Sequence, residues 1–222
     1  MPEIYVKMID PIIAEAVNGM IKFKEMKLES KGRVFQLESI RELEDYCYYV
    51  AGIVGVMLTK VFCQRNSIKD RMPELKKHQI HFGIALQLVN IIKDYKKDLA
   101  RGWCYIPLTV TRKYKVKPEN MGSLSLRQQQ GILKDMSRMA IIYLDSAMEY
   151  IKLLPLEERS IRMFCIMPFL LAYWTLVKII KMEGDKLSRE EVLDLLDRCN
   201  IYAESNGPFE EDYLMAKKTI SD

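Results

Sequence analysis

The chain has 222 residues, of which 49% are hydrophobic and 29% charged, and its formal net charge is +4. This length permits one domain with a sizeable core, and the apolar share excludes an intrinsically disordered chain. The weak positive charge fits a mixed solvated surface, an anionic small substrate or a membrane surface, and is too small to indicate nucleic acid. Five scattered cysteines without CxxC spacing, beside only two histidines, argue against a zinc site and favour a reducing, cytoplasmic compartment.

Helix-forming residues dominate, glycine and proline are few, and no alternating strand pattern bounded by turns occurs. The sequence therefore predicts an all-α protein with a single domain over residues 1–222. We expect no secretory signal at the start. Two uncharged runs, 46–59 and 163–177, are shorter than the roughly 20 residues that a membrane-spanning helix needs. We expect both to be buried core helices, with no transmembrane anchor.

The hydrophobic periodicity and the helix-terminal residues together predict the helices in chain order. These cover residues 3–28, 39–57, 73–101, 126–154, 157–182 and 188–200. Ser39 with Glu42, and Ser188 with Glu191, have the spacing of capping boxes at helix starts. Gly102 marks the end of the third helix, because glycine commonly follows a helix C-terminus.

The remaining segments are predicted to be connections. Residues 63–72 read as a loop, 103–107 as an extended segment and 113–123 as a polar connection. The residue before a proline avoids the helical region, which explains the extended segment before Pro107. Pro168 should kink its helix or expose the backbone there. The tail, 204–222, is predicted to be loose or a short terminal helix.

A stripe of polar residues occurs in the helix predicted at 73–101. Gln87, Asn90, Asp94 and Asp98 share one face, because residues three or four apart are neighbours on a helix. Two carboxylates and two amides on a helix with an apolar back would suit a hard cation such as Mg²⁺, shared with a substrate phosphate. The alternative is a solvated face on which nearby lysines pair with the aspartates.

Small residues interrupt the helix predicted at 39–57. Glycine inside a helix costs about 1 kcal/mol relative to alanine, so Gly52 and Gly55 need a reason. Together with Ala51 they allow something to approach the backbone closely. That neighbour is either another tightly packed helix or an elongated apolar ligand.

Four motifs in order give the chain a resemblance to a known family. They are Tyr-Cys-Tyr-Tyr-Val-Ala-Gly-Ile-Val-Gly at 46–55, Gln-Leu-Val-Asn-Ile-Ile-Lys-Asp at 87–94 followed by Asp98, Tyr-Ile-Pro at 105–107, and Phe-Cys-Ile-Met-Pro at 164–168. Over about residues 17–180 the chain resembles the squalene/phytoene synthase family, and its details resemble squalene synthases more than phytoene synthases.

The resemblance implies an isoprenoid-synthase-type helical bundle that condenses two farnesyl diphosphates head-to-head. The product would be presqualene diphosphate, which squalene synthases reduce to squalene with NADPH. It further implies that Asp94 and Asp98 hold Mg²⁺ against the leaving diphosphate, and that Asn90 and Gln87 orient this cluster. Lys93 stands where squalene synthases usually have arginine, and keeps the positive charge.

The same resemblance assigns roles to further residues. Tyr46, and more weakly Tyr49, would handle a proton or steady the first cation, and Phe164 would face the second carbocation with its ring. Pro168 belongs to the same late motif and is placed in the substrate site. The tunnel for the prenyl chain would be lined by Val50, Ala51, Gly52, Val54 and Gly55.

The chain also departs from the family pattern. Only 45 residues precede Tyr46, and their acids form no aspartate pair of the kind that faces the second motif in the family. We therefore expect an N-terminally truncated bundle, completed by an N-terminal fragment or a partner subunit. Trp103 stands near the family's diphosphate-binding arginine, so Arg101 is the substitute. No basic loop for the nicotinamide cofactor follows 164–168, which makes NADPH the weaker cofactor expectation.

Three functions remain open from the sequence. The first is a squalene synthase-like, Mg²⁺-dependent prenyltransferase that acts on a prenyl diphosphate. The second is a non-catalytic helical protein of interaction or assembly, and the third is a prenyl-lipid binding module. In each case we expect a cytoplasmic protein without nucleic acid, with peripheral membrane contact left open because the product class is lipid.

Overall fold

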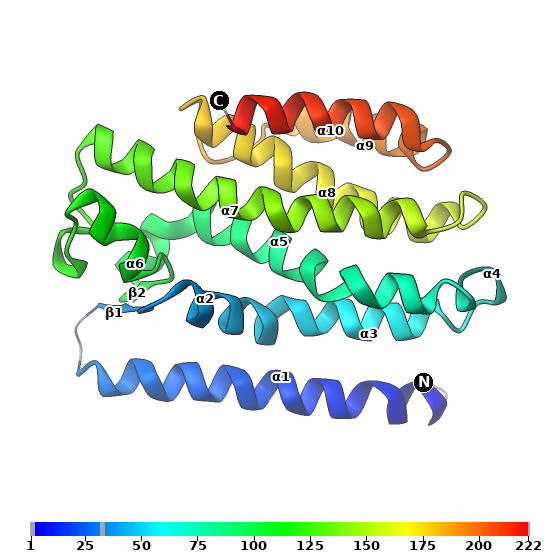
Figure 1. Ribbon diagram of the computed structural model, residues 1–222, viewed down its shortest axis with the longest axis horizontal. Helices are drawn as coiled ribbons and strands as arrows, with labels where there is room; N and C mark the ends of the chain where they lie inside the picture. Colours follow the sequence, from blue (N-terminus) through cyan, green and yellow to red (C-terminus); the bar gives the residue numbers. More distant parts are fainter. Residues whose placement is uncertain (1–2, 32–33, 222) are drawn as a thin grey trace.

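The computed structural model describes residues 3–31 and 34–221, and nearly all of their regular structure is helical. The longer helices are α1 (Glu3–Glu29), α3 (Ile53–Phe62), α5 (Met72–Ala100), α7 (Leu126–Leu153), α8 (Arg159–Ile180), α9 (Arg189–Tyr202) and α10 (Asn206–Ser221). Figure 1 shows them stacked in layers, with α1 on one outer side and α9 and α10 on the other. The all-α prediction is confirmed.

Short elements join these helices, and some of them were not predicted. They are β1 (Phe35–Gln36), α2 (Ile40–Cys47), η1 (Tyr48–Gly52), α4 (Asn66–Lys69), β2 (Trp103–Cys104), α6 (Leu108–Thr111), η2 (Arg112–Tyr114) and η3 (Pro118–Asn120). The predicted loop at 63–72 thus contains one helical turn, and the connection at 113–123 contains 3₁₀ turns. The helix predicted at 39–57 is divided by η1, a single π-helical turn.

Two short strands pair in parallel, although the sequence predicted none. Phe35 lies opposite Trp103, and Gln36 lies opposite Cys104. Strands of two residues are too short for a periodic pattern, and their pairing joins segments that are distant in the chain. The pair fixes the segment before α2 beside the segment after α5.

Side-chain caps start several helices as predicted. The Ser39 hydroxyl accepts a hydrogen bond from the Glu42 amide at 3.2 Å, and Ser188 with Glu191 forms a complete capping box. A second complete box, Ser125 with Gln128, starts α7 and was not predicted. Each cap satisfies amides that the first helical turn leaves without an intrahelical partner.

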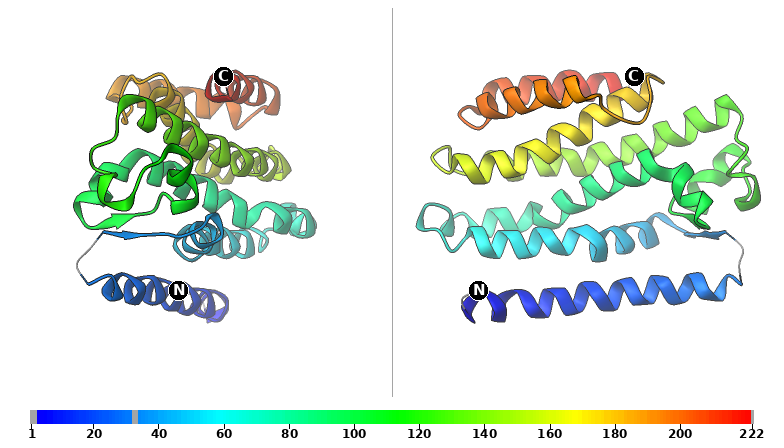
Figure 2. Two further views of the ribbon diagram at one scale, coloured as in Figure 1. Left: turned by 60° about the vertical axis from the view of Figure 1, so that its left-hand side comes forward. Right: turned by 180° about the vertical axis from the view of Figure 1, so that it is seen from behind.

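Helix α5 runs through the middle of the molecule, where it packs against α3, η1, α7 and α8. Figure 2 shows it between the α2–α3 layer and the α7–α8 layer. Its apolar face is buried and contributes Leu88, Ile91 and Ile92 to the core. Burying each such side chain contributes about 1.5–3 kcal/mol. The polar face of the same helix is thereby held at a fixed position.

Helix α8 is apolar enough and long enough to span a membrane, with a mean hydropathy of 1.9 over its most apolar window. In the fold it lies against α7, α9 and α10. Ile166, Phe169, Leu170 and Tyr173 are fully buried there. This agrees with a core helix at 163–177.

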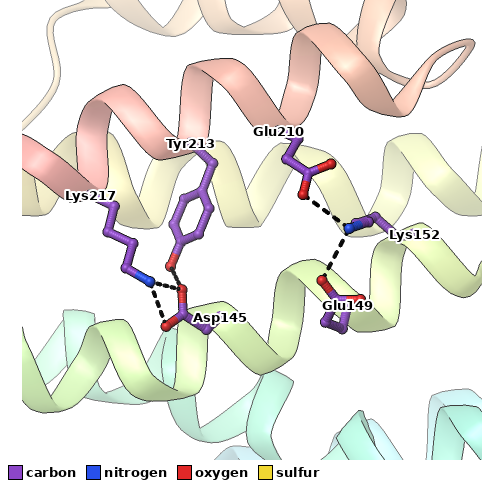
Figure 3. Close-up of polar contacts among 6 residues, drawn as sticks. All are labelled: Asp145, Glu149, Lys152, Glu210, Tyr213 and Lys217. Carbon is purple, nitrogen blue, oxygen red and sulfur yellow. Dashed lines mark hydrogen bonds and ion pairs between the residues drawn. The ribbon is translucent and has the colours of Figure 1, made fainter.

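Helix α10 occupies most of the predicted tail, so the helical alternative holds rather than the loose one. Figure 3 shows how polar contacts fasten it to α7. The Lys217 Nζ atom lies 2.8 Å from Asp145 Oδ1, and the Tyr213 hydroxyl donates to the same oxygen at 2.9 Å. Phe209 and Ile220 are fully buried beneath these contacts. These two residues lie about three turns apart on one face of α10, and their burial attaches the helix to the core.

Candidate active site

Two residues of the polar stripe on α5, Asn90 and Asp94, are linked through lysines of the same helix. The Lys93 Nζ atom lies 3.2 Å from Asn90 Oδ1 and 3.2 Å from Asp94 Oδ2. Lys97 pairs with the other oxygen of Asp94. The oxygen-bearing side chains share one helix face, and lysines of the same helix neutralise Asp94. The magnesium role of the stripe stays a prediction.

The two aspartates of the stripe differ in their electrostatics. Burial raises the pKa of Asp98, and the nearby Asp94 charge raises it further. Burial also opposes ionisation of Asp94, but hydrogen bonds from Lys97 and Lys93 outweigh it and lower the pKa of Asp94. Asp98 thus carries negative charge that its neighbours compensate only in part.

The donor set of the stripe fits one side of a magnesium site. Mg²⁺ takes oxygen ligands, keeps several waters and commonly uses one or two carboxylates together with substrate phosphates. Asp94 and Asp98 supply two carboxylates, and Asn90 supplies an amide oxygen. Among residues 3–31 and 34–221, no group of three or more His, Cys, Asp or Glu side chains could hold a metal ion. The remaining ligands would have to come from outside this stripe.

Tyr46 lies in a stack of aromatic rings beside Asp98. Its ring is stacked on Tyr105, with 4.3 Å between centroids and 22° between planes, and Tyr105 is stacked on Trp103 at 5.3 Å and 16°. Phe23 of α1 meets Tyr46 edge-on at 5.3 Å. The β1–β2 pair contributes to this arrangement, because it holds Trp103 and the residues after it beside the segment that leads into α2.

Tyr46 is a protonated phenol at neutral pH in this setting. Burial raises its pKa, a hydrogen bond from Tyr105 opposes that rise, and Asp98 adds to it. Burial and the bond to Tyr46 raise the pKa of Tyr105 as well. A phenol of this kind donates a hydrogen bond or offers its ring face to a cation, and does not act as a phenolate base.

A large apolar cavity of about 570 Å³ lies between η1, α3, α5 and α8. Volumes of this size are typical of small-molecule sites. The predicted site residues on its wall are Val50, Ala51, Val54, Gly55, Phe164 and Pro168. Proline has no amide proton, so the Phe164 carbonyl one turn earlier lacks its usual helical partner. The side chain of Phe164 is 57% exposed and meets Phe62 edge-on.

The glycines in this region allow two backbones to touch. A Cβ atom on Gly55 would lie 1.9 Å from the Gln79 carbonyl oxygen, and one on Gly83 would lie 2.1 Å from the Ala51 carbonyl oxygen. Gly52 lies against Ile80 and does not line the cavity. Gly55 thus packs tightly against α5, as the helix-packing alternative predicts, and it also borders the cavity. The apolar-ligand alternative stays a prediction.

A smaller cavity of about 240 Å³ adjoins the large one. Leu86 and Pro168 line both, while Asn90 and Lys93 line only the smaller. The two cavities share these two wall residues, and we refer to them together as the groove, whose larger part is apolar and whose smaller part carries Asn90 and Lys93. Such a groove is chemically complementary to a ligand that has an apolar chain and an anionic head group.

Other predicted site residues lie away from the groove. The Tyr49 ring packs against Gly19 of α1, where a Cβ atom would come within 2.0 Å of it. Gln87 is partly buried on α5 and lines neither cavity. Arg101 is exposed at the end of α5, where its charge favours the ionised form of Asp98. The roles of these three residues stay predictions.

Sequence analysis missed the parts of the site that come from far along the chain. Tyr105 was noted within a motif but was given no role, and no pattern placed its ring on Tyr46. Lys27 of α1 was not noted at all. Its ammonium group lies 4.5 Å from the Trp103 ring centroid. These contacts depend on the β1–β2 pairing and on the packing of α1 beside Trp103, which join parts of the chain that are distant in sequence.

The fold and the groove place the chain in a class of proteins. The helical layers match the isoprenoid-synthase-type fold in solved structures. A complex of TcSQS with the ligand BPH1237 superposes with a TM-score of 0.81 at 21% identity, over 99% of this chain and 62% of that one. A dehydrosqualene synthase in complex with a ligand gives a TM-score of 0.58 at 22% identity, over 76% of this chain and 59% of that one.

Comparison of sequences names the family. The squalene/phytoene synthase family model matches residues 6–197, and the chain belongs to this family. The squalene synthase of Schizosaccharomyces pombe is 30% identical over 188 residues, which cover 82% of this chain and 39% of that protein. Squalene synthase 1 of Arabidopsis thaliana is 27% identical over 194 residues, which cover 83% and 47%. The chain thus spans less than half the length of these two relatives.

Proposed function

We propose that this chain carries a prenyl-diphosphate site that takes part in the head-to-head condensation of two farnesyl diphosphates. The observation that supports the proposal is the groove formed by the two adjoining cavities. Its apolar part, about 570 Å³, suits a prenyl chain, and its polar part carries Asn90 and Lys93. Family membership supports the reaction class. The product would be presqualene diphosphate, and squalene where NADPH is used.

The groove residues, and Tyr46 outside the groove, each have a role in this proposal. Lys93 and Asn90 hold the diphosphate by charge and hydrogen bonding. Tyr46 remains protonated and steadies the first allylic cation, while Phe164 offers its ring to the cation of the second step. The walls at Val54 and Pro168 exclude water from the chain. Water exclusion matters because a carbocation reacts with water at once.

Mg²⁺ is the cofactor that this donor set suits. Asp94 and Asp98 would hold it, and it would neutralise the departing diphosphate. The raised pKa of Asp98 supports the assignment, because two neighbouring carboxylates leave negative charge for a cation to compensate. Segments outside the matched half of the relatives would complete the clamp, supplied by an N-terminal fragment or a partner subunit.

Binding of labelled farnesyl diphosphate, with and without Mg²⁺, tests the site directly. We expect Mg²⁺ to strengthen binding to the wild type, and Asp94→Asn to lose that gain. Asp135→Asn is the control, since Asp135 pairs with Lys113 elsewhere on the surface. Failure of the wild type to bind, or equal Mg²⁺ dependence in Asp94→Asn, would contradict the proposal.

A second candidate is a non-catalytic interaction or assembly protein of the same family. It is favoured by the ion pairs of Asp94 with Lys93 and Lys97, which neutralise one ligand within α5. Product analysis separates the two. Release of diphosphate and formation of a C30 product, by the chain alone or with the N-terminal segment of a relative, supports the enzyme. Binding without turnover in both mixtures supports the second candidate.

A further inference from the structure

Four side chains from three distant segments form a column that ends at Tyr46. The Lys27 ammonium lies 4.5 Å from the Trp103 ring centroid, Trp103 is stacked on Tyr105, and Tyr105 is stacked on Tyr46. The interplanar angles along the stack are 16° and 22°. Near-parallel rings at these spacings restrict one another's rotation.

Two contacts hold the Lys27 ammonium group in place. Its Nζ atom donates a hydrogen bond of 2.6 Å to the Arg101 carbonyl oxygen, just past the end of α5. The same ammonium lies over the indole, where the cation–π attraction adds to the bond. Lys27 therefore links the outermost helix α1 to the segment after α5, which includes β2 and Tyr105.

The edges of the column are closed by two further rings. Phe35 of β1 meets Trp103 edge-on at 5.5 Å, and Phe23 of α1 meets Tyr46 edge-on at 5.3 Å. Tyr46 is consequently held on one face by Tyr105 and at its edge by Phe23. Its orientation beside Asp98 depends on the whole column rather than on α2 alone.

We propose that Lys27, acting through Trp103 and Tyr105, is a positioning residue that fixes the Tyr46 ring for the reaction. This inference rests on the proposed function only for its kinetic consequence, because the column can be measured without substrate. Lys27 touches neither cavity of the groove, so its effect should appear in kcat rather than in KM. A misplaced catalytic group costs on the order of tenfold or more in rate.

Fluorine NMR tests the column itself. The chain has two tryptophans, so incorporation of 5-fluorotryptophan gives two resonances, and Trp103→Phe assigns them. Lys27→Met should move the Trp103 resonance, leave that of Trp174 in place, and be reversed by Lys27→Arg. Lys7→Met is the matched control, because Lys7 lies near the other end of the same helix and its side chain is 76% exposed. A Trp103 resonance that Lys27→Met does not move would overturn the proposal.

Kinetics test the role in the reaction. Lys27→Met should lower kcat on the order of tenfold with little change in KM, and Lys27→Arg should restore it. Combined with Tyr46→Phe, Lys27→Met should cause little further loss, because both act on one group. Losses that multiply independently would show that Lys27 does not act through Tyr46. If Lys27→Met folds poorly, Lys27→Gln takes its place. If the wild type has no turnover, the proposed function fails, and the fluorine spectra still decide whether the column exists.

Discussion

At the scale of single residues, Arg162 has the most demanding environment in the core. Its side chain is fully buried and donates five hydrogen bonds, to the carbonyls of Ile151, Leu154, Tyr202 and Ala203 and to the amide oxygen of Asn206. These carbonyls lie at the C-terminal ends of α7 and α9, where helices leave acceptors unpaired and favour positive charge. One guanidinium thus closes two helix ends.

Arg162→Met should therefore lower the free energy of unfolding by about 3 kcal/mol or more, because it leaves several buried acceptors unpaired. Urea denaturation monitored by circular dichroism measures the loss. Arg159→Met is the matched control, because the Arg159 side chain is 51% exposed and its ion pair should contribute well under 1 kcal/mol. Similar losses in the two variants would contradict this role of Arg162.

The Asp98 carboxylate at the candidate site should lower the stability of the folded protein. Its pKa is raised by burial and by Asp94, so the folded state disfavours the carboxylate relative to the unfolded chain. Ionised Asp98 therefore destabilises the fold at pH 7, and this penalty disappears as pH falls through its raised pKa. Asp98→Asn should raise Tm at pH 7 by roughly 2 °C.

That gain should shrink as pH is lowered toward about 4, where the wild-type carboxyl becomes protonated. Thermal melts of both proteins across this range provide the measurement. Mg²⁺ should raise the Tm of the wild type more than that of Asp98→Asn, because only the former offers both carboxylates. A lower Tm for Asp98→Asn at pH 7 would show that Asp98 stabilises the fold.

At the scale of elements, the contact between α5 and the η1–α3 segment depends on glycine. The backbone carbonyls of Gln79 and Ala51 occupy the space that side chains on Gly55 and Gly83 would need. This close approach sets the width of the large cavity, which the same elements line. Glycine is a weak helix former, but at these two positions it allows the two helix backbones to pack in direct contact.

Gly83→Ala should destabilise the protein by about 1–3 kcal/mol, because the added methyl group would clash with the Ala51 carbonyl oxygen. Gly207→Ala in α10 is the control, because nothing lies within 4 Å of the position of its Cβ atom, and it should be neutral or slightly stabilising. Chemical denaturation compares the two. Equal stability of Gly83→Ala and the wild type would mean that α5 moves away at no cost.

The sequence predicted helices well and predicted their interruptions poorly. The starts at Ser39 and Ser188 carry local hydrogen-bonding signals, so they could be placed from spacing alone. The π turn η1 could not, because no local pattern marks it and it packs against α5, which is a later segment of the chain. The β1–β2 pair has the same explanation, since its partners lie in distant segments.

At the scale of the whole molecule, the groove is assembled by packing between layers. Val54, Asn90 and Phe164 come from α3, α5 and α8, and each was predicted from a motif. The order of the polar and apolar parts could not be predicted, since it depends on how α8 crosses α5. For the same reason, Tyr49 was grouped with Tyr46, although its ring packs against α1.

The outer layer formed by α10 also supports the core beneath the groove. Removal of residues 206–222 would expose the surface that Phe209, Tyr213 and Ile220 cover, and should lower the free energy of unfolding by at least about 4 kcal/mol. Tyr213→Phe retains the packing and should cost only about 1 kcal/mol, for its bond to Asp145. Urea titrations of both variants measure these losses. A truncated chain as stable as the wild type would show that α10 is dispensable.

The π turn η1 affects whether the loss of the groove in a related protein could be recognised from its sequence. One residue of an α-helix corresponds to about 100° of rotation, so the wider turn sets the angle between Tyr46 before it and Val54 after it. A chain that lost one residue within 48–52 would keep the three later motifs and most of its sequence similarity. The residues after the deletion would nevertheless point to a different side of the helix. Only the number of residues between Tyr46 and Val54, within the first motif, would reveal that the groove had been lost.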